Sequence, residues 1–129
     1  MFVMIVTLSE KGVTEIIGSF FGEDLTVLKY GVASFLSANV INNIPMSVLF
    51  SSIIEGAGIQ NAVQAVYATV VGSNLGAFFT PIGALAGIMW SSIVGEHGVK
   101  FGYLDFLKMG VTVAIPSLIA ALAVLGLIL

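Results

Sequence analysis

The chain has 129 residues, of which 58% are hydrophobic and only 9% charged, and its formal net charge is -3. Soluble domains carry about 25% charged residues, so this composition, with a mean hydropathy of +1.12, excludes an ordinary soluble domain and predicts an all-α membrane protein. The absence of cysteine excludes disulfides and thiolate metal sites. No basic patch favours nucleic acid and no constellation of catalytic side chains is visible, so we expect no enzyme, no cofactor and no metal site.

Residues 1–22 are predicted to form a partial span and a short interfacial helix. Met1 to Leu8 is apolar from the first residue and lacks the basic flank and cleavage site of a signal peptide. A polar turn at Glu10 precedes the helix expected over Val13 to Phe21. This beginning suggests a fragment of a longer membrane protein, and a short open reading frame that starts at Met1 is the alternative.

Residues 25–54 form an apolar run that is interrupted near its middle by three asparagines and Pro45. Asparagine and proline disfavour the interior of a helix, and proline also restricts the residue before it. Each half of the run is about 12 to 14 residues, or roughly 20 Å of helix, which is short of a hydrocarbon core of about 30 Å. We therefore predict a re-entrant hairpin with its tip at Asn39 to Pro45; one span kinked at Pro45 is the alternative.

Residues 62–95 lie in a stretch without any charged residue and are too long for one untilted span. Glycine, asparagine and proline interrupt this stretch between Gly72 and Pro81. We predict a discontinuous helix with one half from Ala62 to Val71 and a second from Pro81 to Val94. Thr80 is the expected N-cap of the second half, whose N-terminal dipole would face a cavity.

Residues 109–129 are predicted to form the last span, with a kink at Pro116. The polar connection before it, Glu96 to Lys108, contains the single histidine, His97. We interpret His97 as a loop histidine rather than a catalytic or metal-binding residue. Two of the four basic residues also lie in this connection, so the positive-inside tendency places it in the cytoplasm. The loops at Glu23 and Glu55 are then expected on the outside.

Two polar islands therefore interrupt helices at similar depth, one in each of the two central segments. Helix breakers and amides inside the hydrocarbon layer are tolerated where the backbone lines a protected cavity, which in transporters is the substrate site. Polar and small residues in spans also serve in helix packing, and this remains the alternative for any single residue. The candidate substrate-binding residues of the two islands are Asn39, Asn42, Asn43, Ser73, Asn74 and Thr80.

The order of these parts resembles the second half of carriers of the ion transporter superfamily. Within it, the residues Ser37 to Met46 and Tyr67 to Ala86, followed by Trp90, are most similar to the arsenical pump membrane proteins, the ArsB-type arsenite efflux carriers. The resemblance covers essentially the whole chain. It implies an inverted-repeat fold, of which this chain holds the C-terminal half, and a multi-pass protein of a prokaryotic plasma membrane. The family often has an acidic residue or cysteine where this chain has Asn74. This difference weakens any charge-based coupling of transport to an ion by the loop that contains Asn74.

The resemblance implies secondary active transport, namely efflux of arsenite or antimonite by proton antiport and hence arsenical resistance. Amides and hydroxyls, each worth about 0.5–1.5 kcal/mol per hydrogen bond, suit the reversible capture of uncharged As(III) trihydroxide. A citrate or sodium/proton carrier of the same superfamily and a non-transporting truncated fragment are the alternatives. The expected partners are the lipid bilayer and a missing N-terminal half or second chain that supplies the first repeat. The family also allows a soluble ATPase subunit and a homodimer.

Overall fold

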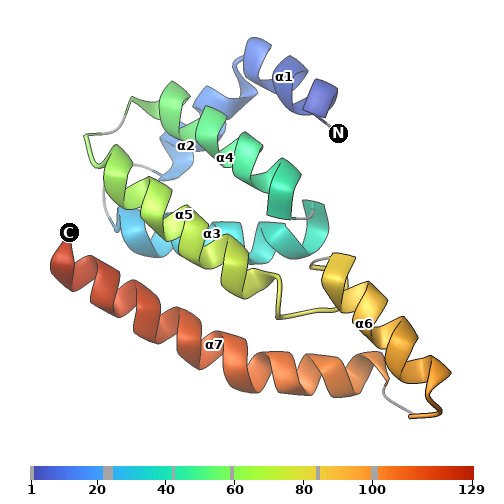
Figure 1. Ribbon diagram of the computed structural model, residues 1–129. Coiled ribbons are helices and arrows are strands. Elements are labelled where there is room, and N and C mark those ends of the chain that lie inside the picture. Colours follow the sequence, from blue (N-terminus) through green and yellow to red (C-terminus); the bar gives the residue numbers. More distant parts are fainter. Residues whose placement is uncertain (1, 22–24, 42, 59, 84, 100–101) are drawn as a thin grey trace.

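The computed structural model describes residues 2–21, 25–41, 43–58, 60–83, 85–99 and 102–129. Within these ranges the chain forms helices and no strand (Figure 1), which confirms the predicted all-α class. The helices in chain order are α1 (Phe2–Glu10), α2 (Val13–Phe21), α3 (Thr26–Ile41), α4 (Asn43–Ala57), α5 (Ala62–Gly76), α6 (Leu85–Glu96) and α7 (Tyr103–Ile128).

The helices are arranged around α3 and α5, which make the most extensive contact between two helices. Helix α4 packs against both of them, and α1 and α2 lie on α4. Helix α7 runs along the opposite side of α3 and α5, and α6 projects from the bundle beside the first turns of α7 (Figure 1). The segment that joins α5 to α6 therefore lies between the central pair and α7.

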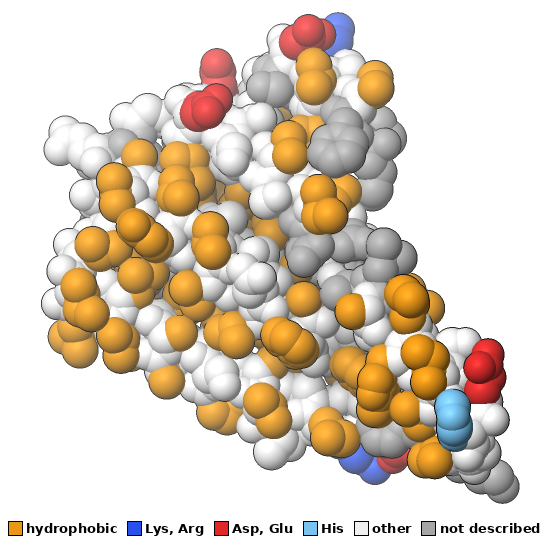
Figure 2. All heavy atoms as spheres, in the orientation of Figure 1, with side chains coloured by type: hydrophobic (Ala, Val, Ile, Leu, Met, Phe, Trp, Pro, Cys, Tyr) orange, Lys and Arg blue, Asp and Glu red, His pale blue; other side chains and the backbone are white. Residues whose placement is uncertain are grey.

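The core is apolar and is contributed by four helices. Aromatic rings fill the region between α2, α3 and α4, where the ring centroid of Tyr30 lies 4.9 Å from that of Phe21 and 6.3 Å from that of Phe50. Many large hydrophobic side chains are exposed as well, and on the face shown in Figure 2 they cover the middle while charged side chains lie near the edges. This distribution is the one expected of a protein that lies in a membrane.

Helix α7 is, among the described residues, the one helix that is long and apolar enough to cross a membrane. It has 26 residues, or about 39 Å at 1.5 Å per residue. Helix α3 has 16 residues, or about 24 Å, which is less than the roughly 30 Å of a hydrocarbon core. Helix α3 and the segment Ile44–Ala57 of α4 are shorter apolar helices.

Helices α3 and α5 approach so closely because α5 presents glycines to α3. A Cβ atom added at Gly72 would overlap the Gly31 carbonyl oxygen and the Ser34 hydroxyl, and one added at Gly76 would overlap the Phe35 carbonyl oxygen. Small residues four apart allow such backbone contact between helices in membranes. The glycines of the second island are therefore packing residues.

The predicted halves of the discontinuous helix have the wrong bounds. Helix α5 continues to Gly76 rather than ending at Val71, because the backbone contact with α3 supports the glycines in helical conformation. Helix α6 begins at Leu85 rather than at Pro81, and residues 77–83 form turns and two bends instead. Thr80 is therefore not the N-cap of the second half.

Two further bounds differ from the sequence prediction. Helix α3 continues to Ile41 and α4 begins at Asn43, so the interruption is shorter than Asn39 to Pro45; Pro45 is accommodated because it lies in the first turn of α4, where proline is tolerated. Helix α7 begins at Tyr103 rather than at residue 109. Its first turn is stabilised by the carboxylate of Asp105, which accepts a hydrogen bond of 3.1 Å from the Gly102 backbone nitrogen.

Candidate functional site

The two polar islands meet in the folded chain. The hydroxyl of Thr80 donates a hydrogen bond of 2.7 Å to the Oδ1 atom of Asn39, across 41 positions of sequence. Asn39 lies near the end of α3 and is half-buried, whereas Thr80 lies in the link between α5 and α6 and is 8% exposed. This bond joins the last turn of α3 to the link after α5.

The carboxamide of Asn39 is held at both ends. Its Nδ2 atom donates to the Phe35 carbonyl oxygen at 2.9 Å, while its Oδ1 atom accepts the Thr80 bond. The link folds over this group, since a Cβ atom added at Gly83 would lie 2.9 Å from Asn39 Oδ1 and 2.9 Å from the Gly76 carbonyl oxygen. Only glycine fits at position 83 without moving these atoms.

Backbone hydrogen bonds fix the shape of the link itself. The Phe79 nitrogen donates to the Gly76 carbonyl oxygen at 3.0 Å, and the Gly83 nitrogen donates to the Thr80 carbonyl oxygen at 3.1 Å. The ring of Phe79 packs against that of Phe35 with centroids 5.2 Å apart. Thr80 is thus positioned by turns on both sides and by an aromatic anchor on α3.

Helix α7 holds the other side of the link. A Cβ atom added at Gly110 would overlap the Phe79 carbonyl oxygen and lie 2.9 Å from the Phe78 carbonyl oxygen. The link backbone therefore rests directly on α7 at this glycine. The sequence did not predict this role of Gly110, because a single glycine in an apolar span does not indicate which segment packs against it.

Ser73 and Asn74 are neighbours in sequence but face different surroundings. Ser73 is buried and Asn74 is exposed. Both donate to the Val70 carbonyl oxygen, Ser73 from its hydroxyl at 3.0 Å and Asn74 from its Nδ2 atom at 2.8 Å. The structure therefore places Ser73 in the helix packing and leaves Asn74 on an outer surface of this chain.

The remaining candidates of the first island, Asn42 and Asn43, follow α3 in the sequence. Asn42 lies outside the described residues, as does the side chain of Asn43, whose backbone begins α4. Among the candidates whose side chains are described, Asn39 and Thr80 are the pair that the fold brings into contact.

The groups at this site are neutral. Amide, hydroxyl and backbone carbonyl groups surround Asn39 and Thr80 in the described contacts. The described residues contain no group of three or more His, Cys, Asp and Glu side chains that could hold a metal ion. His97 is exposed, with its Nδ1 atom 2.9 Å from the Ile93 carbonyl oxygen. The chemistry available at the site is therefore the exchange of neutral hydrogen bonds.

Comparison with known proteins assigns the chain to a family. The family model described as arsenical pump membrane protein matches residues 1–129. The chain belongs to the arsenical pump membrane protein family. It is 27% identical over 136 residues to an arsenical pump membrane protein of Yersinia enterocolitica and 30% identical over 98 residues to one of Escherichia coli strain K12.

The match to these relatives of the arsenical pump family covers only part of their length. The alignment with the Yersinia enterocolitica protein takes in 98% of this chain and 32% of the relative, and that with the Escherichia coli strain K12 protein takes in 74% and 23%. The chain therefore spans about a third of the curated relatives that it matches over its whole length. No solved structure matches it.

Proposed function

We propose that this chain forms part of a secondary active carrier that exports arsenite or antimonite in exchange for protons. The observation that carries the proposal is the contact between the last turn of α3 and the link after α5, where Thr80 donates to Asn39. Irregular backbone and amides at membrane depth occur where they line a cavity for a substrate. Membership of the arsenical pump membrane protein family supports the choice of cargo.

The hydrogen-bonding groups at this contact suit a small neutral polyol. Because the Thr80 hydroxyl donates to Asn39, its oxygen lone pairs are left to accept. One N–H of the Asn39 amide donates to the Phe35 carbonyl oxygen, and the amide has a second N–H to offer. As(III) trihydroxide both donates and accepts through its hydroxyl groups. Each neutral bond is worth only about 0.5–1.5 kcal/mol, so capture remains reversible.

The architecture that we propose has α3 and α4 as a re-entrant hairpin and α5 and α6 as the halves of a discontinuous helix. Helix α3, at about 24 Å, falls short of a span of about 30 Å. A complete carrier would then need a first repeat from the remaining two thirds of the family's usual length or from a second chain. Since amides and hydroxyls do not titrate near neutral pH, we assign proton coupling to residues outside the Asn39 and Thr80 pair.

A complementation assay tests the proposal. The full-length protein would be expressed in arsenite-sensitive cells, with Thr80→Val removing the hydroxyl at nearly constant volume. The loss of one hydrogen bond of about 1 kcal/mol weakens capture roughly fivefold. We expect lower arsenite resistance at an unchanged amount of membrane-inserted protein.

The matched control is Thr112→Val. Thr112 is exposed on α7 and its hydroxyl bonds only within the helix, to the Lys108 carbonyl oxygen at 2.7 Å. This variant should retain wild-type resistance. If the inserted wild-type protein leaves the cells sensitive, or if both variants behave alike, the proposal is wrong. If arsenite uptake into everted vesicles persists in the presence of a protonophore, only the proton-antiport part of the proposal is refuted.

A further inference from the structure

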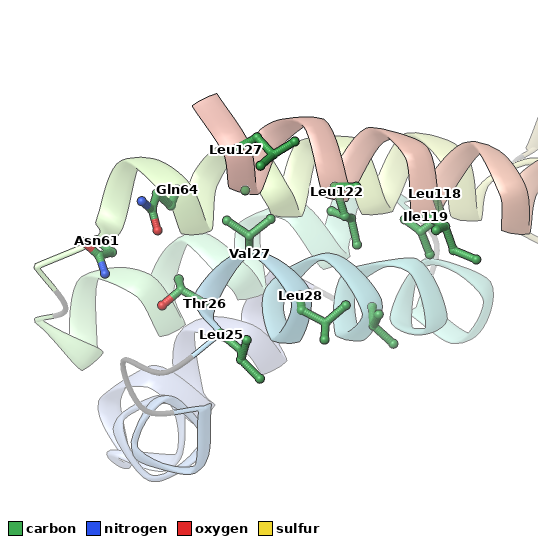
Figure 3. A pocket seen from close by; sticks show the side chains of 13 residues that line it. Leu25, Thr26, Val27, Leu28, Asn61, Gln64, Leu118, Ile119, Leu122 and Leu127 are labelled. Atoms are coloured by element: carbon green, nitrogen blue, oxygen red, sulfur yellow. The ribbon is translucent and has the colours of Figure 1, made fainter. Parts of the chain in front are cut away.

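A groove lies away from Asn39 and Thr80, between the first turns of α3 and α5 and the last turns of α7. Its volume is about 790 Å³. The side chains of Leu28 and Val32 form its α3 wall, and those of Leu118, Ile119 and Leu122 form its α7 wall. Figure 3 shows Leu28, Leu118, Ile119 and Leu122 along the groove. The walls are apolar over most of their length.

The polar side chains of the groove gather at one end. Thr26, Asn61 and Gln64 lie toward the end that is marked by Leu127, whereas Leu118 and Ile119 lie at the other end (Figure 3). No charged side chain lines the groove in the part of the chain that the structure describes. A second cavity, of about 260 Å³ between α6 and α7, is lined by Phe78, Trp90 and other apolar residues and has no such polar end. The polarity of the larger groove thus matches a molecule with one neutral polar end.

The length of the groove matches one leaflet of a bilayer. Its α7 wall runs from Leu118 to Leu127, which corresponds to about 14 Å at 1.5 Å per residue. Half of a hydrocarbon core is about 15 Å. A helix that spanned the whole hydrocarbon core of about 30 Å would be about twice as long as this groove. The groove therefore fits a lipid tail better than a second spanning helix.

We propose that this groove binds one acyl chain of a membrane lipid with an uncharged or zwitterionic headgroup. The headgroup end lies at Asn61 and Gln64. The Nε2 atom of Gln64 donates to the Leu129 carbonyl oxygen at 2.7 Å, which leaves its amide oxygen to accept from a lipid hydroxyl or amine. Asn61 makes no side-chain hydrogen bond to cap α5. The tail contacts the apolar walls through dispersion.

Photo-crosslinking of the wild-type, full-length protein tests the depth of the tail. The protein would be reconstituted in phosphatidylethanolamine vesicles that carry a diazirine either near the carboxyl end or at the terminal methyl of one acyl chain. The terminal diazirine should label the peptide with Leu118 and Ile119, and the other should label peptides with Gln64 and Leu127. Reversed labelling, or equal labelling of the groove and of the exposed Ile115, which lines neither cavity, would overturn the proposal.

Two alanines on α7 provide a matched pair of variants. Ala123 lines the groove, whereas Ala120 does not, and both are exposed. In Ala123→Trp the indole would exclude about two methylenes of the tail, so groove labelling should fall roughly tenfold. Ala120→Trp should label as wild type does. Equal labelling of both variants, or crosslinks at Ile119 to another protein segment or a second copy, would show that a lipid does not occupy the groove. Stronger labelling by an anionic phosphatidylglycerol probe than by the phosphatidylethanolamine probe would overturn the proposal that the headgroup is uncharged or zwitterionic.

Discussion

Replacing Gly76 with alanine should weaken the contact between α3 and α5. The new Cβ atom would overlap the Phe35 carbonyl oxygen and lie 3.1 Å from both the Cα and the carbonyl carbon of Phe35. These are backbone atoms that cannot rotate away, so the helices must separate. Overpacking of this kind costs about 1–3 kcal/mol. Because Gly76 ends α5, the higher helix propensity of alanine, at most about 1 kcal/mol, offsets only part of the cost.

The expected net loss is about 1–2 kcal/mol, which for a chain of this size lowers the melting temperature by roughly 3–8 °C. Far-UV circular dichroism of the purified protein in detergent measures it. Gly95→Ala in α6 is the matched control, since an added Cβ atom there meets nothing within 4 Å, and it should melt at or slightly above the wild-type temperature. If the melting temperature of Gly76→Ala equals that of the wild type, the described contact between α3 and α5 is not the one that stabilises them.

Three further predictions concern other residues. In the full-length protein, Asn39→Ala should lower transport about fivefold through one lost hydrogen bond with membrane expression unchanged, whereas Ser92→Ala, at an exposed position of α6, should transport as the wild type does; lower expression with normal transport per molecule would make Asn39 a packing residue. Tyr30→Phe removes a buried hydroxyl that has no hydrogen-bond partner among the described residues, so stability by circular dichroism should rise by up to about 1 kcal/mol, and a fall would reveal a partner. Gly110→Ala should push the link away from α7 at a cost of about 1–3 kcal/mol, and an unchanged melting temperature would contradict the contact.

The sequence predicts where the helices are interrupted better than where they end. Prolines and amides within charge-free runs correctly indicate breaks between α3 and α4 and between α5 and α6. The end of α5 is missed because Gly72 and Gly76, which have low intrinsic helix propensity, are stabilised by contact with α3. That contact is tertiary, so no local pattern contains it.

The candidate site is only partly predictable for a similar reason. Thr80 before Pro81 has the local pattern of an N-cap, but its hydroxyl bonds to Asn39 instead. Adjacent helical residues point about 100° apart, which explains why Ser73 is buried while Asn74 is exposed. The sequence names the polar residues but does not determine which of them share a surface.

The contact between α6 and α7 provides an intrinsic fluorescent probe. The chain contains one tryptophan, and the ring of this residue, Trp90, meets the ring of Phe106 edge to face with centroids 5.9 Å apart. Because α6 otherwise projects from the bundle (Figure 1), a movement of α6 relative to α7 changes the surroundings of the only indole. Emission from that indole would follow the position of α6 in real time.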